Sequence, residues 1–184
     1  MKIFARIISI LALLVIIFLA YAATRPDSFS VQRSTAIQAP PQKIFALIDD
    51  FKAWPAWSPW EKLDPAMTRS FSATTSGKGA NYAWAGDSKA GAGRMEIIDD
   101  AAPTSITIKL DFIKPIESSN KVVFTLEPKG DATTVTWTMN GPSPFVSKVL
   151  GVFFNMDEMI GGDFETGLGN LKAFAEDVGE SKPE

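Results

Sequence analysis

The residues of this chain that could do chemistry are aromatic rather than nucleophilic. Its 184 residues include five tryptophans but no cysteine and no histidine. The chain therefore has no thiol nucleophile, and it lacks the commonest metal ligand and general base. The sequence contains no nucleophile-plus-base pair, metal-ligand spacing or glycine-rich phosphate loop. We therefore predict no catalytic residue, no metal site and no cofactor, and the sequence favours a binding protein over an enzyme.

The large amphipathic side chains indicate a site for an apolar molecule. Such sites are lined mainly by aromatic and aliphatic side chains, and flexible methionines suit an irregular ligand. We expect Tyr82 to donate a hydrogen bond to a ligand carbonyl. The competing interpretation is that these side chains simply fill the core. The expected ligand-binding residues are Trp57, Trp60, Tyr82, Trp84, Phe112, Trp137, Met156, Met159, Ile160 and Phe164.

Four glycines in the C-terminal segment, Gly161, Gly162, Gly167 and Gly169, lie where a long helix is predicted. Together they cost roughly 3 to 4 kcal/mol relative to alanine in a helix interior. Two explanations remain open. The missing side chains leave room for a ligand between the helix and a sheet, or they allow close packing or a kink.

Hydrophobic periodicity predicts the elements that position these residues. Alternating apolar residues predict strands at 29–37, 106–112, 122–126 and 135–139, with a hairpin turn at 129–131. Prolines introduce short helices at 41–52 and 145–154, and they favour a packed loop or broken helix at 54–65. A long helix follows from residue 155 to about 178. Its apolar face consists of Ile160, Phe164, Leu168, Leu171, Ala175 and Val178.

These elements predict an α+β helix-grip fold, in which a curved antiparallel sheet wraps around the long C-terminal helix. An antiparallel sheet with one apolar face must cover that face, and the long helix is the element able to cover it. We expect residues 25–178 to form one domain and residues 179–184 to be a disordered tail.

Residues 1–24 are expected to be a transmembrane anchor or a signal segment. Lys2 and Arg6 precede an apolar run at 7–23, which spans about 25 Å as a helix, close to a bilayer core of about 30 Å. We expect an uncleaved single-pass anchor with its N-terminus inside and the domain outside the cytoplasm, in the periplasm. The alternative is cleavage near Ala22, after the A-x-A-like sequence Ala20-Tyr21-Ala22, which would leave a secreted or periplasmic protein.

Three segments resemble the START-related superfamily known as SRPBCC, which includes polyketide cyclases and lipid-transport-like proteins. They are the strand-to-helix entry Ile37-Gln38-Ala39-Pro40-Pro41-Gln42-Lys43-Ile44-Phe45, the Trp54 to Pro65 segment, and Asn155-Met156-Asp157 leading into Phe164 to Phe174. The resemblance covers nearly all of residues 29–178 and implies the same helix-grip fold. The superfamily also contains hydrolases, co-chaperones and pure binders, so the fold does not settle the function.

The leading hypothesis is a membrane-tethered extracytoplasmic module that binds a lipid or other hydrophobic small molecule in a cavity between the sheet and the C-terminal helix. The alternatives are a cyclase-like or hydrolase-like enzyme with a buried carboxylate of raised pKa, and an envelope protein-interaction module. A net charge of −3 and a pI of about 5.1 argue against a nucleic-acid partner. The sequence sets no oligomeric state.

Overall fold

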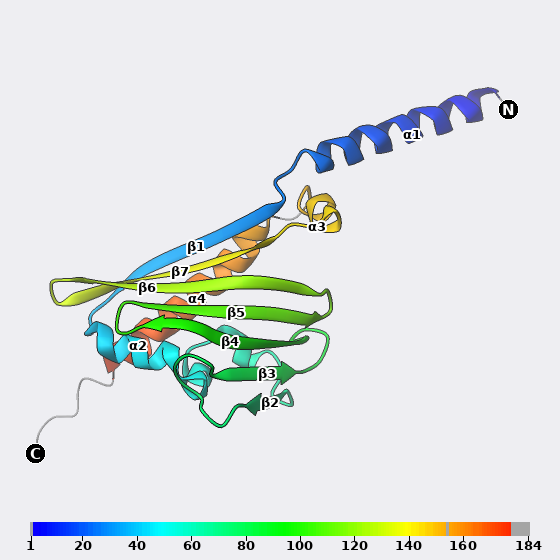
Figure 1. The fold of residues 1–184 in the computed structure, drawn as a ribbon. Helices are drawn as coiled ribbons and strands as arrows, with labels where there is room; N and C mark the ends of the chain where they lie inside the picture. Colours follow the sequence, from blue (N-terminus) through cyan, green and yellow to red (C-terminus); the bar gives the residue numbers. More distant parts are fainter. Residues whose placement is uncertain (1, 154, 178–184) are drawn as a thin grey trace, which may run out of the picture.

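The computed structural model describes residues 2–153 and 155–177. A seven-stranded antiparallel sheet packs against a long C-terminal helix, and an N-terminal helix extends away from the sheet (Figure 1). Phe154, Val178 and the tail at 179–184 lie outside the described residues. The elements, with η for a 3₁₀-helix, are α1 (Lys2–Ala23), β1 (Ser28–Ile37), α2 (Pro41–Asp49), η1 (Phe51–Ala56), η2 (Pro59–Lys62), β2 (Thr68–Phe71), β3 (Asn81–Ala85), β4 (Ala92–Ala101), β5 (Ser105–Lys114), β6 (Ser118–Lys129), β7 (Ala132–Pro142), α3 (Phe145–Leu150) and α4 (Met156–Asp177).

The strand order in the sheet is β1-β7-β6-β5-β4-β3-β2. The register brings the starts of β1, β4 and β6 together with the ends of β3, β5 and β7. Ser28 pairs with Pro142, Phe112 with Ser118, and Ala92 with both Lys114 and Ala85. The chain leaves α1 directly into the start of β1, so we call this end the α1 end of the sheet (Figure 1).

One face of the sheet forms the core with α4, as the alternating pattern predicts. Ile108, Phe124 and Val135, from three neighbouring strands, are fully buried on this face. On α4, Phe164, Leu168, Leu171 and Ala175 are buried and Ile160 is half-buried. The structure therefore confirms the α+β helix-grip fold.

The N-terminal part of α4 is fixed by polar contacts. The Asn155 side chain accepts a hydrogen bond from the backbone N–H of Asp157 at 3.1 Å, which caps the helix. Arg33 lies on the inner face of β1 and donates to Asp157 at 2.9 Å and to Glu165 at 2.6 Å. These ion pairs attach the first and third turns of α4 to β1.

Two short helices end earlier than the sequence predicts. The first ends at Asp49, because Asp50 is extended and its side chain accepts the backbone N–H of Lys52, which starts η1. The second ends at Leu150, where Gly151 caps α3 and a turn follows. Pro55 lies inside η1, Pro59 starts η2 and Pro65 follows η2, so this segment is a broken helix, one of the two predicted forms.

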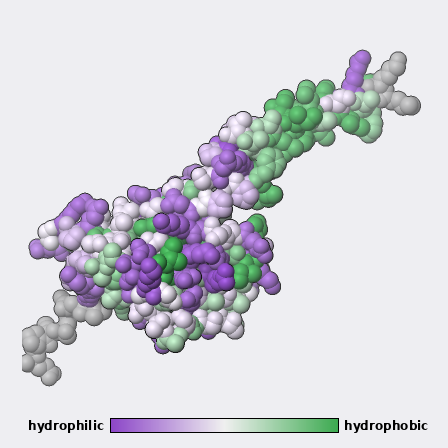
Figure 2. All heavy atoms as spheres, in the orientation of Figure 1, coloured by the Kyte–Doolittle hydropathy of each residue, from purple (hydrophilic) through white to green (hydrophobic). Residues whose placement is uncertain are grey.

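The helix α1 extends away from the sheet and is apolar along its length (Figure 2). Residues Ile3–Ala23 are long and apolar enough to cross a membrane, and they are also compatible with a signal sequence. Most of these side chains are exposed. Ala22 is buried and Phe18 is half-buried, and both lie on one helical face toward the domain.

Candidate functional site

Three of the expected ligand-binding residues fill the layer between the sheet and α4. Trp57, Trp137 and Phe164 each expose 2% or less of their surface. Trp137 stacks on Phe164 with ring centroids 4.2 Å apart, and Trp57 meets Trp137 edge-on at 5.7 Å. In this structure the three side chains form core contacts with one another.

The helix glycines separate into two kinds. A Cβ atom at Gly161 would lie 2.1 Å from the Arg33 guanidinium, and one at Gly167 would lie 2.8 Å from the Trp137 ring. These two glycines therefore let α4 approach β1 and β7 closely. A Cβ atom at Gly162 or Gly169 would meet nothing within 4 Å. Close packing explains the first pair and leaves the second pair unexplained.

Four further expected residues, Trp60, Trp84, Phe112 and Ile160, are half-buried and pack against the edge of the core. We call them the aromatic rim. Trp84 pairs with Gly93, and Gly93 pairs with Phe112, so the two aromatic residues lie across neighbouring strands at the α1 end. The Trp84 ring covers Gly93 and meets Phe112 edge-on at 6.0 Å.

The other two rim residues come from the opposite layer. The indole N–H of Trp60 donates to Asp163 of α4 at 3.2 Å, and its ring meets Trp137 edge-on. Ile160 lies in the second turn of α4, immediately before Gly161. The rim residues thus come from the sheet, η2 and the start of α4, and each is partly exposed.

The two expected methionines, Met156 and Met159, lie at the start of α4. Met159 exposes 60% of its surface on the first turns of α4. The side chain of Met156 is outside the described part of the structure.

Tyr82 belongs to a polar cluster that sequence reasoning missed. Its hydroxyl donates to Glu61 Oε1 at 2.6 Å, while Arg69 donates to Glu61 Oε2 at 2.7 Å. The Glu61 side chain is only 6% exposed. Burial and the hydrogen bond to Glu61 raise the pKa of the Tyr82 hydroxyl. In this structure the Tyr82 hydroxyl therefore donates its proton to Glu61, whereas the sequence predicted donation to a ligand carbonyl.

The signal for Glu61 was present in the sequence. It is an acidic residue that directly follows Trp60 in an aromatic, proline-rich segment expected to be packed. A charge in a buried segment requires a partner. The partner could not be identified, because Arg69 lies on β2, a short strand without clear alternation.

Three buried side-chain polar atoms lack a hydrogen-bond partner among the described residues: Asp49 Oδ1, Asn120 Oδ1 and Trp137 Nε1. Trp137 Nε1 has no hydrogen-bond acceptor among the described residues, although the residue is only 2% exposed. A buried unpaired donor costs about 1 to 3 kcal/mol. This N–H lies among the aromatic side chains between the sheet and α4, where it is available to an acceptor atom.

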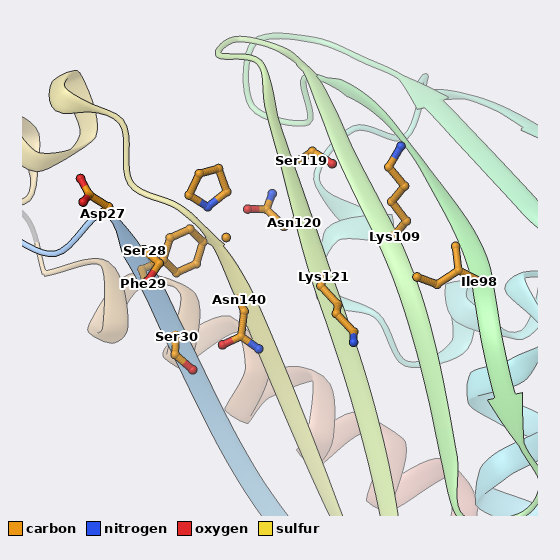
Figure 3. A pocket seen from close by; sticks show the side chains of 12 residues that line it. Asp27, Ser28, Phe29, Ser30, Ile98, Lys109, Ser119, Asn120, Lys121 and Asn140 are labelled. Carbon is orange, nitrogen blue, oxygen red and sulfur yellow. The ribbon is translucent and has the colours of Figure 1, made fainter.

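A hollow lies on the other face of the sheet. Its volume is about 710 Å³, and it is an open depression over β1, β7, β6 and β5. Figure 3 shows Ser30, Lys109, Lys121 and Asn140 around it, with α4 behind the strands. Its charged lining does not suit an apolar ligand. A second hollow, of about 530 Å³, lies beside it over Asp111, which is already paired with Arg94 and Lys109.

The family model for polyketide cyclase / dehydrase and lipid transport matches residues 28–176. This chain belongs to that family. The match begins at β1 and ends within α4, so it includes the sheet, the aromatic rim and the Glu61 cluster but not α1. Membership in the polyketide cyclase / dehydrase and lipid transport family supports a module that binds a hydrophobic ligand.

Solved structures agree with the polyketide cyclase / dehydrase and lipid transport fold. A protein from Rhizobium leguminosarum has a TM-score of 0.60 at 15% identity, over 82% of this chain and 95% of that one. One from Chromobacterium violaceum has a TM-score of 0.58 at 13% identity, over 83% and 99%. DynU16, from the dynemicin biosynthetic locus, has a TM-score of 0.56 at 16% identity, and the match covers 83% of this chain and 48% of DynU16. These identities show the fold alone. The search of curated proteins found no match.

The carboxylate with a raised pKa in this polyketide cyclase / dehydrase and lipid transport domain is Asp49. Burial raises its pKa, and nearby Asp100 and Asp50 add to the effect. Asp49 lies at the end of α2 and accepts a hydrogen bond from the backbone N–H of Gly77. This site is near the end of β4 that lies farther from α1. It is therefore distant along the sheet from Trp84 and Phe112.

Proposed function

We propose that this chain is a membrane-tethered, extracytoplasmic module that binds a lipid or other hydrophobic small molecule between the sheet and α4. The observation that carries the proposal is the aromatic rim. Trp84 and Phe112 from the sheet, with Trp60 and Ile160 from the opposite layer, present partly exposed apolar surface at the edge of the core. Apolar pockets with few polar groups are typical of such ligand sites.

The polar part of the ligand has a candidate donor in Trp137 Nε1. This N–H is buried and unpaired among the described residues, and the Trp60 ring lies against the Trp137 ring at 5.5 Å. A ligand that displaces Trp60 would place an acceptor near the indole N–H and remove the cost of an unpaired donor. An apolar chain would then occupy the space beside Trp84 and Phe112.

Two observations support an anchor rather than a cleaved signal. Ala22, the last residue of the A-x-A-like sequence, is fully buried. The Phe18 ring lies 5.4 Å from the Phe153 ring of the domain. Cleavage after Ala22 would remove Phe18 and uncover Phe153, whereas an intact α1 keeps this contact.

Photo-crosslinking tests the binding site. The full chain is reconstituted into vesicles that contain increasing fractions of a phospholipid with a photoreactive acyl chain, and crosslinked peptides are mapped by mass spectrometry. We expect labelling at Trp84 and Phe112 that saturates with lipid fraction, because a binding site has limited capacity. Labelling of α1 by bulk lipid should keep rising and serves as the internal reference.

A matched pair of variants sharpens the test. Phe112→Glu places a charge on the rim, and Ile113→Glu places the same charge on the adjacent, exposed residue of the opposite sheet face. Phe112→Glu should abolish the saturable labelling while Ile113→Glu retains it. Labelling confined to α1, or equal loss in the two variants, would contradict the proposed site.

The enzyme alternative gains no supporting geometry. The buried carboxylate nearest the rim cluster, Glu61, is held by both Arg69 and Tyr82. Asp49, which has the raised pKa, lies toward the other end of the sheet. A carboxylate that acts as a general base must reach the substrate proton. Glu61 is occupied by Arg69 and Tyr82, and Asp49 is far from Trp84 and Phe112, so neither carboxylate has this access.

A further inference from the structure

A helix on the surface of a soluble domain usually buries its apolar residues and exposes its charged residues. The short helix α3 has the reverse arrangement. None of its residues is buried, and Phe145, Val146 and Leu150 expose 47%, 63% and 43% of their surfaces. Its one charged residue, Lys148, has a side chain only 9% exposed, which forms an ion pair with Asp27 at 2.5 Å. The apolar residues therefore face outward while the cation is turned toward the chain that leaves α1.

The apolar surface continues past the helix into the following turn. Phe153 exposes 70% of its surface and packs against Phe18 of α1. The backbone N–H of Ser143 donates to the Asp27 carbonyl at 2.7 Å. Together with the Lys148 ion pair, this bond fixes α3 beside the lower end of α1 (Figure 1).

The contact with Phe18 sets the depth of this surface relative to a membrane. The candidate span Ile3–Ala23 has 21 residues, which is about 31 Å of helix for a bilayer core of about 30 Å. Phe18 precedes the end of α1 at Ala23 by about 7.5 Å of helix. A side chain packed on Phe18 then lies about 5–10 Å inside the boundary, the depth of interfacial apolar residues.

We propose that Phe145, Val146, Leu150 and Phe153, here called the collar, insert into the lipid interface of the membrane that α1 crosses. This inference rests on the proposed membrane anchor. The bilayer is the occupant favoured by the structure, because the collar is continuous with the apolar surface of α1 and is attached to it at Phe18. A contiguous exposed apolar surface on a soluble domain marks an interaction site.

The collar has a consequence for the aromatic rim. The start of α4 follows the collar directly in the chain, and Trp84 and Phe112 lie at the α1 end of the sheet. Insertion of the collar would hold this end of the domain against the lipid surface. A hydrophobic ligand could then pass between the bilayer and the rim with little exposure to water.

Single-cysteine labelling tests the collar in the full chain. The chain contains no cysteine, so each introduced cysteine is a unique label position. A polarity-sensitive fluorophore is attached at Val146→Cys, at Leu13→Cys in the middle of α1, and at Asp131→Cys in the hairpin turn between β6 and β7. The reconstituted protein is then exposed to vesicle lipids that carry quenchers at the headgroup, in the upper acyl chain or at the chain end.

We expect the Val146 label to lose most of its fluorescence to headgroup and upper-acyl quenchers. The Leu13 label should respond to the chain-end quencher, and the Asp131 label to none. A Val146 label as water-exposed as that at Asp131, with Leu13 in the acyl region, would overturn the collar while leaving the anchor intact. A Leu13 label outside the acyl region would overturn both the anchor and the collar. Circular dichroism confirms that each labelled variant is folded.

Discussion

Glu61 joins three elements through its two oxygen atoms and its backbone carbonyl. Tyr82 of β3 donates to one carboxylate oxygen, and Arg69 of β2 donates to the other and to the Glu61 carbonyl of η2. The arrangement holds the Tyr82 ring between Phe71 at 5.0 Å and Trp84 at 5.9 Å. We therefore assign Glu61 and Arg69 a positioning role for the rim residue Trp84.

The Tyr82 hydroxyl should titrate well above the usual pKa of about 10. The chain has two tyrosines, so Tyr21→Phe leaves tyrosinate absorbance as a report on Tyr82 alone. Because the folded pKa is raised, the stability gained from this proton is present below about pH 10 and is lost as the pH rises beyond that value. Adding Glu61→Gln should lower the titration midpoint. A folded protein that titrates near pH 10 would contradict the hydrogen bond.

The four helix glycines provide a matched set of stability measurements. Gly162→Ala and Gly169→Ala should each stabilise the protein by about 1 kcal/mol, because the new methyl group meets nothing and the helix gains propensity. Gly161→Ala and Gly167→Ala should each destabilise it by about 1 to 3 kcal/mol, through contact with Arg33 and Trp137. Urea denaturation measures all four. Equal effects across the set would contradict the close approach of α4.

At this scale, residue types were predictable and partners were not. The sequence named the tryptophans and phenylalanines of the core and rim, since their size requires burial. It could not separate Gly161 from Gly162, because the distinction depends on which side chain lies opposite each Cβ position. It could not show that Trp57 and Trp137 contact each other, because Trp57, which follows η1, is far from β7 in the chain.

At the scale of elements, α4 is held against β1 by contacts that include ion pairs between one arginine and two acidic residues. The Arg33 guanidinium binds Asp157 and Glu165 and needs the space left by Gly161. The alternation of β1 placed Arg33 on the inner face, together with Val31 and Ile37. Periodicity identified β1, β5, β6, β7 and α4. The partner of Arg33 depends on how α4 lies across β1, which local patterns do not encode.

Asp157→Asn should destabilise the protein at neutral pH, because it removes one partner of Arg33. Arg33 lowers the pKa of Asp157, so this contribution is present above the unfolded pKa of about 3.9 and is lost as the pH falls through the folded pKa. The difference in stability between the wild type and the Asp157→Asn variant should therefore become smaller below about pH 4. Thermal unfolding at several pH values measures it. Glu158→Gln, which removes the same charge at the next position, should leave a smaller difference at every pH.

At the scale of the whole molecule, one end of the domain combines α1, the collar residues and the rim residues Trp84 and Phe112. The register of the sheet places the ends of β3 and β5 on the side where β1 leaves α1. Each feature was readable separately in the sequence as an apolar run, a proline-led helix and surplus aromatic residues. Their convergence depends on the antiparallel register of seven strands, which sequence patterns did not determine.

An intact tether has a direct chemical consequence. We expect the intact mass of the protein isolated from membranes to include α1, because Ala22 is buried and Phe18 packs on the domain. Mass spectrometry of the mature protein distinguishes the two outcomes. A mature chain that begins at Ala23 would show cleavage and would remove the anchor from the account.

Organic extraction followed by mass spectrometry tests the central claim, that the domain holds a hydrophobic molecule between the sheet and α4. Residues 25–184, which contain the whole family match, are purified without detergent so that no bilayer supplies lipid. The account predicts a hydrophobic molecule in near-stoichiometric amount, strongly reduced by Phe112→Glu and retained in Ile113→Glu. Repeated extractions of folded protein that yield no such molecule, together with no uptake of a fluorescent fatty acid, would contradict it.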